Sequence, residues 1–203
     1  MTEPKHAPTS IPTTPPTQTP TPTPTPERTG GPRIYVASLS DYNAGRLHGR
    51  WIDASKDAAA IHAEIRVMLA ESREPPAEEW AIHDSEGFGE YGVGEFESIE
   101  KVAETAALIA EHGEVFAGLL SHFGGDLDDA KKWMEEGYRG EWDSLAEYAE
   151  NFIDDVYCGE LKGLPDIIRH HIDYDGIAHD FEVSGDIFTV ACDGKVHVFD
   201  SNI

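Results

Sequence analysis

The chain is poor in positively charged residues. Its 203 residues include 15 Lys and Arg against 39 Asp and Glu, which gives a formal net charge of -24. A surface with this excess of negative charge repels nucleic acid and anionic membranes and attracts basic proteins. The composition therefore argues against direct binding of DNA, RNA or a lipid surface.

Cysteine and long apolar runs are also scarce. The two cysteines, Cys158 and Cys192, form neither a disulfide framework nor a zinc-binding spacing. No stretch of about 18 or more apolar residues predicts a transmembrane helix. No apolar stretch of about 7 to 15 residues follows the start, as a signal peptide would require. We expect a protein of the reducing cytoplasm.

The first 32 residues differ from the rest of the chain. They include ten Pro and ten Thr, with a plain Thr-Pro repeat from Thr19 to Pro26, and all 19 Phe, Trp and Tyr residues follow them. This segment has too few apolar groups to offset the entropy of ordering, so residues 1–32 are predicted to be a disordered, polyproline-like spacer. Residues 33–203 are predicted to fold, and they carry the whole net charge.

Residues 33–97 are predicted to form a small domain of helices and strands. Short strands are expected at 34–39 and 47–52, around a turn-prone loop at 40–45. Ser55 is the expected N-cap of a helix that continues to Ala70. A further strand is expected at 80–88, after Pro75 and Pro76 end the helix.

The remaining segments are a small helical domain, 98–135, and an acidic domain, 136–203. Helices are predicted at 99–113, 115–123 and 127–136, the last capped by Asp126. Ser144 and Glu147 form a capping box for a helix through Val156, in which each side chain satisfies the other's backbone amide. A short helix is expected at 164–172, and a hairpin turns at Asp193-Gly194. The fold class is therefore predicted to be α+β.

The histidines and acids do not predict a metal site. His170 and His171 are adjacent and point in different directions on a helix, so a shared ion would need His179 or Asp173 as well. The segment from Asp126 begins like a calcium loop. It has Lys131 where such a loop needs glycine and Gly137 where it needs glutamate. No catalytic residue, metal or cofactor is predicted, although the many carboxylates leave a carboxylate-dependent hydrolase as an alternative.

The acids are concentrated towards the C-terminus. Residues 136–203 carry 16 acids and 4 Lys or Arg, a net charge of -12. Duplex DNA presents one charge per roughly 1.7 Å, so 24 charges correspond to about 41 Å of duplex, or about 12 base pairs. Mimicry of nucleic acid, a general acidic module that binds basic proteins, and a halophile-type or merely soluble surface all remain open from composition.

Several separate stretches resemble the ArdA antirestriction family. They are IYVASLSDYNAGRLHGRWIDA at 34–54, EEWAIHDSEGF at 78–88, and LLSHFGGDLDDAKKWMEEGYRGEWDSLAEYAENFIDD at 119–155. The last contains LDDAKKWMEEGYRGE at 127–141, which is similar to the family's antirestriction motif. IDYDGIAHDFEVSGDIF at 172–188 is similar in character to the family's closing region.

The resemblance implies an elongated chain of three small domains that imitates bent duplex DNA. It implies a competitor for the DNA-binding groove of type I restriction-modification enzymes, formed by their methyltransferase and specificity core, with no catalysis and no cofactor. The acids expected to replace phosphates begin one residue before the motif and continue beyond it: Asp126, Asp128, Asp129, Glu135, Glu136, Glu141, Asp143, Glu147, Glu150, Asp154 and Asp155.

The resemblance also implies a homodimer formed through the C-terminal domain. The pattern of residues 183–188 suggests an unpaired strand edge, which pairs readily with its own copy across a two-fold axis. The expected interface residues are Val183, Ser184, Gly185, Asp186, Ile187 and Phe188.

Overall fold

The computed structural model describes residues 31–203. The disordered tail predicted for residues 1–32 therefore lies outside the described residues, apart from its last two. Pro32 is buried, and its carbonyl accepts a hydrogen bond of 2.9 Å from the amide of Ala54. Pro32 thus belongs to the folded part of the chain.

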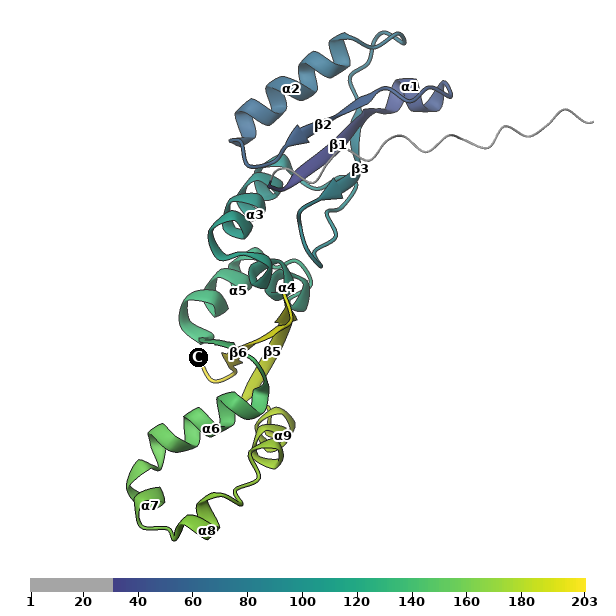
Figure 1. The fold of residues 1–203 in the computed structure, drawn as a ribbon. Helices are drawn as coiled ribbons and strands as arrows, with labels where there is room; N and C mark the ends of the chain where they lie inside the picture. The colour runs from purple at the N-terminus through teal and green to yellow at the C-terminus, as the bar shows by residue number, and fades with distance from the viewer. Residues whose placement is uncertain (1–30) are drawn as a thin grey trace, which may run out of the picture.

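Helices and strands alternate along an elongated molecule, in agreement with the predicted α+β class. Figure 1 shows one sheet at one end, a group of helices in the middle, then a second sheet, and further helices at the other end. The predicted division into three domains at 97/98 and 135/136 stays a prediction.

The first sheet is antiparallel, with β1 (Arg33–Ser38) between β2 (Gly49–Asp53) and β3 (Trp80–Glu86). Helix α2 (Ala58–Ala70) packs on it with Ile61, Ile65 and Met68. Asp57, and not Ser55 as predicted, caps this helix, because its side chain accepts the Ala60 amide.

The prediction of a loop at 40–45 was wrong in part. Its first half forms the short helix α1 (Leu39–Asn43), with Ser38 as N-cap. The reason is Asp41, whose side chain is buried and accepts a hydrogen bond from Ser72, far along the sequence. This tertiary contact stabilises a turn that the local residues alone suggested would be open.

The middle of the molecule contains α3 (Ile99–His112), α4 (Glu114–His122) and α5 (Leu127–Lys132). The predicted end at Gly113 and the predicted cap at Asp126 are confirmed. The third helix does not stay α-helical to Glu136. Its last turn is a π-helix, η1 (Trp133–Gly137), in which the Trp133 ring packs where a Cβ of residue 137 would lie.

The second sheet has the order β4-β6-β5. The predicted hairpin is confirmed as β5 (Ile187–Cys192) and β6 (Lys195–Asp200), with positive φ at both turn residues, Asp193 and Gly194. The strand β4 (Tyr138–Trp142) was not predicted. It pairs with β6, which lies more than 50 residues later in the sequence, so no local sequence pattern predicts it.

Between β4 and β5 the chain forms an arm, residues 145–184, which extends to the far end of the molecule (Figure 1). It consists of α6 (Leu145–Val156), α7 (Cys158–Lys162), α8 (Asp166–Arg169) and α9 (Tyr174–Ser184). The helix predicted at 164–172 is limited to the four residues of α8. Helix α9 was missed, although Asp173 caps it and its apolar residues recur at helical spacing.

One apolar core connects most of the molecule. It extends from Ile34 in β1 through α2, α3 and α4 to Val190 and Phe199 in the second sheet. The close approach of α4 to β5 requires Gly118, because a Cβ there would lie 2.4 Å from the Val190 side chain. A separate, smaller cluster holds α6 and α9 to the second sheet.

None of the helices between residues 31 and 203 has the length and apolar character needed to cross a membrane.

Candidate partner-binding surface

The acids predicted to bind a partner are all exposed. The eleven side chains lie on two successive stretches, one from α5 into η1 and the other from β4 through α6. Of these eleven, only Glu141 and Asp143 form ion pairs within residues 31–203, both with Lys195. Nine carboxylates are therefore available to cations from another molecule.

The first stretch is organised by the start of α5. The Asp126 side chain accepts the amides of Asp128 and Asp129, each at 3.1 Å, which explains the calcium-like spacing as a helix cap. Asp128 and Asp129 then occupy the first turn, where the helix dipole favours negative charge. Glu135 and Glu136 follow in η1.

The second stretch begins at β4 and enters α6 through a cap. Ser144 accepts the Glu147 amide at 3.2 Å, as the capping box predicts. The reciprocal contact differs from the prediction, because Glu147 accepts the amide of Asp143, at 2.8 Å, instead of that of Ser144. The cap holds Glu147 at the start of a row that continues along α6.

Helix α6 presents its acids because its other face is held by aromatic packing. Tyr148 and Phe152 contact Phe181 of α9, with ring centroids 6.3 and 5.2 Å apart. Glu147, Glu150 and Asp154 are exposed on the rest of the helix. At about 1.5 Å rise per residue, this row spans about 10 Å along the axis.

The negative charge of α6 affects the pKa of a side chain in α9. Burial raises the pKa of the Tyr174 hydroxyl, and the carboxylates of Asp154 and Glu150 raise it further. The arm also carries six exposed acids that were not among the predicted site residues: Glu160, Asp166, Asp173, Asp175, Asp180 and Glu182. The signal that could have found them was the net charge of the C-terminal third, together with the missed helix α9.

Two of the candidate metal ligands, His171 and Asp173, are engaged in local contacts. His171 contacts the carbonyl of Ile167 through Nδ1 at 2.8 Å, and Asp173 caps α9 by accepting the Gly176 amide. In the described part of the chain no three His, Cys, Asp or Glu side chains are grouped so that they could hold a metal ion.

The hydrolase alternative requires a carboxyl shielded from water in a concave cleft. A cleft beside β3 is lined by His83, Asp84 and Glu95, among other residues. Both of its carboxylates are exposed, so nothing in this cleft separates an acid from a base by environment.

The residues predicted for the dimer interface do not form one strand. Val183 and Ser184 end α9, and Gly185 caps it in the left-handed conformation. Ile187 is buried, and Phe188 stacks on Phe199 at 5.0 Å. The surface offered to a second copy therefore consists of residues 183–186 and of the backbone edge of β5, which pairs only with β6.

Comparison with known protein families gives one match. The model of the family described as antirestriction protein (ArdA) matches residues 34–194. A search of curated proteins found no match. The matched range contains both stretches of exposed acids and the whole arm.

Proposed function

Because this chain belongs to the ArdA antirestriction family, we propose that it inhibits type I restriction-modification enzymes as a non-enzymatic mimic of duplex DNA. The observation that carries the proposal is the exposed row of acids, of which nine form no ion pair within residues 31–203. The partner is the DNA-binding groove formed by the methyltransferase and specificity core.

The shape and the charge of the molecule support mimicry of an extended polyanion. The two acidic stretches lie on successive tiers of an elongated chain (Figure 1). Their carboxylates offer to Lys and Arg the same charge-assisted hydrogen bonds that phosphates offer. A folded anion array also requires none of the bending energy that real DNA needs when a protein deforms it.

Competition with DNA tests the proposal. Purified protein should displace duplex DNA from a type I methyltransferase core, and its affinity should fall as the salt concentration rises. The reason is that exposed charges are screened once the Debye length shrinks to about 8 Å at physiological ionic strength. Equal affinity at low and high salt would show that the acids take no part in binding. Equally tight binding to histone-like proteins would favour a general acidic module instead.

We also propose a homodimer formed through residues 183–188. Val183 is 71% exposed at the end of α9, beside the unpaired edge of β5. Two copies of a segment with net charge -12 repel each other, so association should strengthen from low to moderate salt.

Sedimentation tests the dimer. Val183→Glu adds a charge at the exposed position and should weaken association without unfolding the protein, whereas Phe188→Pro would disturb the aromatic packing around Phe199 and is a poor probe. A wild type that stays monomeric at high micromolar concentration in moderate salt rejects the dimer but leaves the mimicry intact.

A further inference from the structure

A cleft of about 800 Å³ lies beside β3, and β3 lies towards the opposite end of the molecule from α6 (Figure 1). Helix α1, strand β3 and the segment 92–95 form its walls. Leu39, Ile82 and Val93 contribute apolar surface to the lining, and Asp84 and Glu95 contribute negative charge. Among residues 31–203, no Lys or Arg lines the cleft, so its lining is complementary to a positively charged group.

One wall of the cleft is a strand edge. Strand β3 pairs with β1 on one side only, and a bulge leaves His83 without a partner in the register. On the other side, the Ile82 amide donates to the carbonyl of Glu95 at 2.9 Å. After Ile82, the backbone groups of residues 83–86 form no hydrogen bond to any described segment other than β1. The Ser85 amide donates to the Asp84 carboxylate at 2.8 Å.

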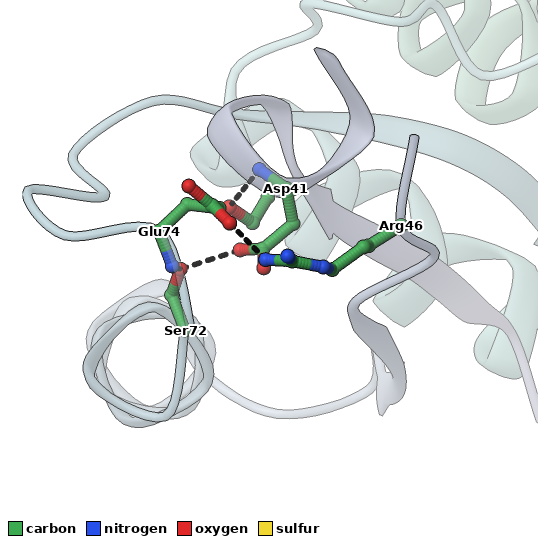
Figure 2. A network of polar contacts seen from close by, with 5 residues as sticks. Asp41, Arg46, Ser72 and Glu74 are labelled. Atoms are coloured by element: carbon green, nitrogen blue, oxygen red, sulfur yellow. Dashed lines mark hydrogen bonds and ion pairs between the residues drawn. The ribbon is translucent and has the colours of Figure 1, made fainter. Parts of the chain in front are cut away.

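The wall formed by α1 is held in place by a polar network (Figure 2). The Ser72 hydroxyl donates to the buried Asp41 carboxylate at 2.5 Å, and Arg46 forms an ion pair with Glu74. These contacts tie α1 to the segment after α2. Tyr42, on the same short helix, is 57% exposed, and His83 meets its ring edge-on at 5.0 Å.

The opposite wall is held by Glu97. Its carboxylate accepts hydrogen bonds from the Tyr91 hydroxyl, from Lys101 at 2.8 Å and from the Gly94 amide at 3.0 Å. These contacts brace the segment that carries Val93 and Glu95. Both walls are thus fixed by internal contacts, so the cleft exists before any partner arrives.

We propose that this cleft docks an extended, arginine-bearing segment of a partner protein, which adds to the free edge of β3. Backbone groups of an added strand pair with an open edge, and pockets beside the edge select alternate side chains. A guanidinium group stacks on an aromatic ring and hydrogen-bonds to carboxylates, which here are Tyr42, Asp84 and Glu95. An arginine that engages Asp84 also frees the Ser85 amide for the incoming strand.

This contact goes beyond the proposed mimicry of DNA, because it depends on strand pairing at one defined cleft and not on an extended row of charge. Loss of the contact would leave displacement of DNA by the α5 and α6 acids intact. Loss of that displacement would likewise leave peptide binding at the cleft intact. The two proposals therefore fail separately.

Peptide binding to the full chain tests the inference. The probe is a fluorescent nine-residue peptide of alternating Arg and Thr, measured by anisotropy. Replacing Arg by Glu should weaken binding at least about tenfold, because the carboxylates then repel the peptide. Methylating alternate backbone amides keeps the charge but removes ladder hydrogen bonds, and should weaken binding about tenfold. Undiminished binding of the methylated peptide would overturn strand addition.

Matched protein variants locate the binding site. The double variant Asp84→Asn with Glu95→Gln should lose affinity for the Arg-Thr peptide by about fivefold. The control, Glu111→Gln with Glu160→Gln, loses the same charge at exposed positions outside the cleft and should bind as the wild type does. Equal losses of peptide affinity in both variants would mean that the peptide is attracted non-specifically by negative charge, and would overturn the proposed site. Amide NMR shifts of residues 82–85 on titration supply a second readout, and their absence overturns the proposal.

Discussion

In the N-terminal region, residues 33–97, four of the six Lys and Arg side chains form ion pairs with nearby glutamates. In the arm, residues 145–184, ten acids accompany two basic residues, and no ion pair forms within the described chain. The N-terminal region thus uses most of its basic side chains to offset four of its 13 acids, whereas the acids of the arm have no ion-pair partner within the described chain.

The two regions also differ in how they bury apolar side chains. The N-terminal region contributes Ile34, Val36, Ile52, Ile61 and Ile65 to a core in which each is at most 2% exposed. The arm buries only four residues, which are up to 9% exposed: Tyr148, Ala149, Leu161 and Ala178. Its outer helices leave apolar side chains in solvent: Val156, Tyr157, Ile167, Ile168 and Val183.

The comparison shows that the same residue type serves two roles in one chain. Asp41 and Glu97 accept internal hydrogen bonds and hold walls of the β3 cleft, so they stabilise structure. Glu150 and Asp154 accept none from the described protein and lie exposed. The local supply of donors, and not the number of acids, separates structural carboxylates from those available to a partner.

The largest difference between the regions should appear in stability. Phe116→Ala removes a fully buried ring from the large core and should lower the free energy of unfolding by about 3–5 kcal/mol. Ile167→Ala, at a 73% exposed position in α8, should change it by less than about 0.5 kcal/mol. Urea unfolding of both variants measures the difference. Similar costs would mean that the end of the arm is packed as tightly as the core.

The second largest difference should appear in inhibition. Each exposed charge pair contributes up to about 1 kcal/mol, so neutralising four arm acids together should weaken displacement of DNA by about 30-fold. The arm variant combines Glu147→Gln, Glu150→Gln, Asp154→Asn and Asp155→Asn. The matched control changes to Gln four N-terminal glutamates that already form ion pairs with Arg or Lys: Glu64, Glu71, Glu74 and Glu86. This control should weaken displacement of DNA by less than about threefold.

Single substitutions test whether the acids act as a distributed interface. Asp128→Asn alone should weaken inhibition by no more than about fivefold. If one such change abolished inhibition while the protein stayed folded by circular dichroism, a catalytic or metal-binding role would replace the distributed interface.

The smallest expected effect concerns acid pH. Burial acts to raise the pKa of Glu97, but the hydrogen bonds from Lys101, Tyr91 and Gly94 outweigh it, so its pKa lies below the usual value of 4.5. Its contribution to stability is therefore full above that value and is lost as the pH falls through the lowered pKa. Glu97→Gln should cost about 1 kcal/mol at neutral pH and less in acid.

Thermal denaturation at pH 7 and at pH 3 measures this effect. Glu95→Gln, two residues away and exposed, is the control and should show no such pH dependence. An equal cost of Glu97→Gln at both pH values would mean that the hydrogen bonds do not depend on the charge.

Much of the local structure was predictable, because its signals lie within a few consecutive residues. Ser98, Asp126 and Ser144 cap helices as side chains that accept an amide two or three positions later. Asp193-Gly194 turns the hairpin because both residues accept positive φ. The resemblance to the ArdA family likewise depended on the sequence alone, and the family match over residues 34–194 confirms the family.

The sequence by itself thus determined the excess of negative charge, the helix caps at Asp126 and Ser144, the hairpin and the family. Only the tertiary structure decided that β4 pairs with β6, that residues 183–184 are helical, and that Asp41 is buried against Ser72 while the α6 acids are free. The physical reason is that each of these outcomes depends on a partner many residues away. A carboxylate stabilises the fold only where the fold brings a hydrogen-bond donor close to it. The distance between the two groups in space cannot be read from their positions in the sequence.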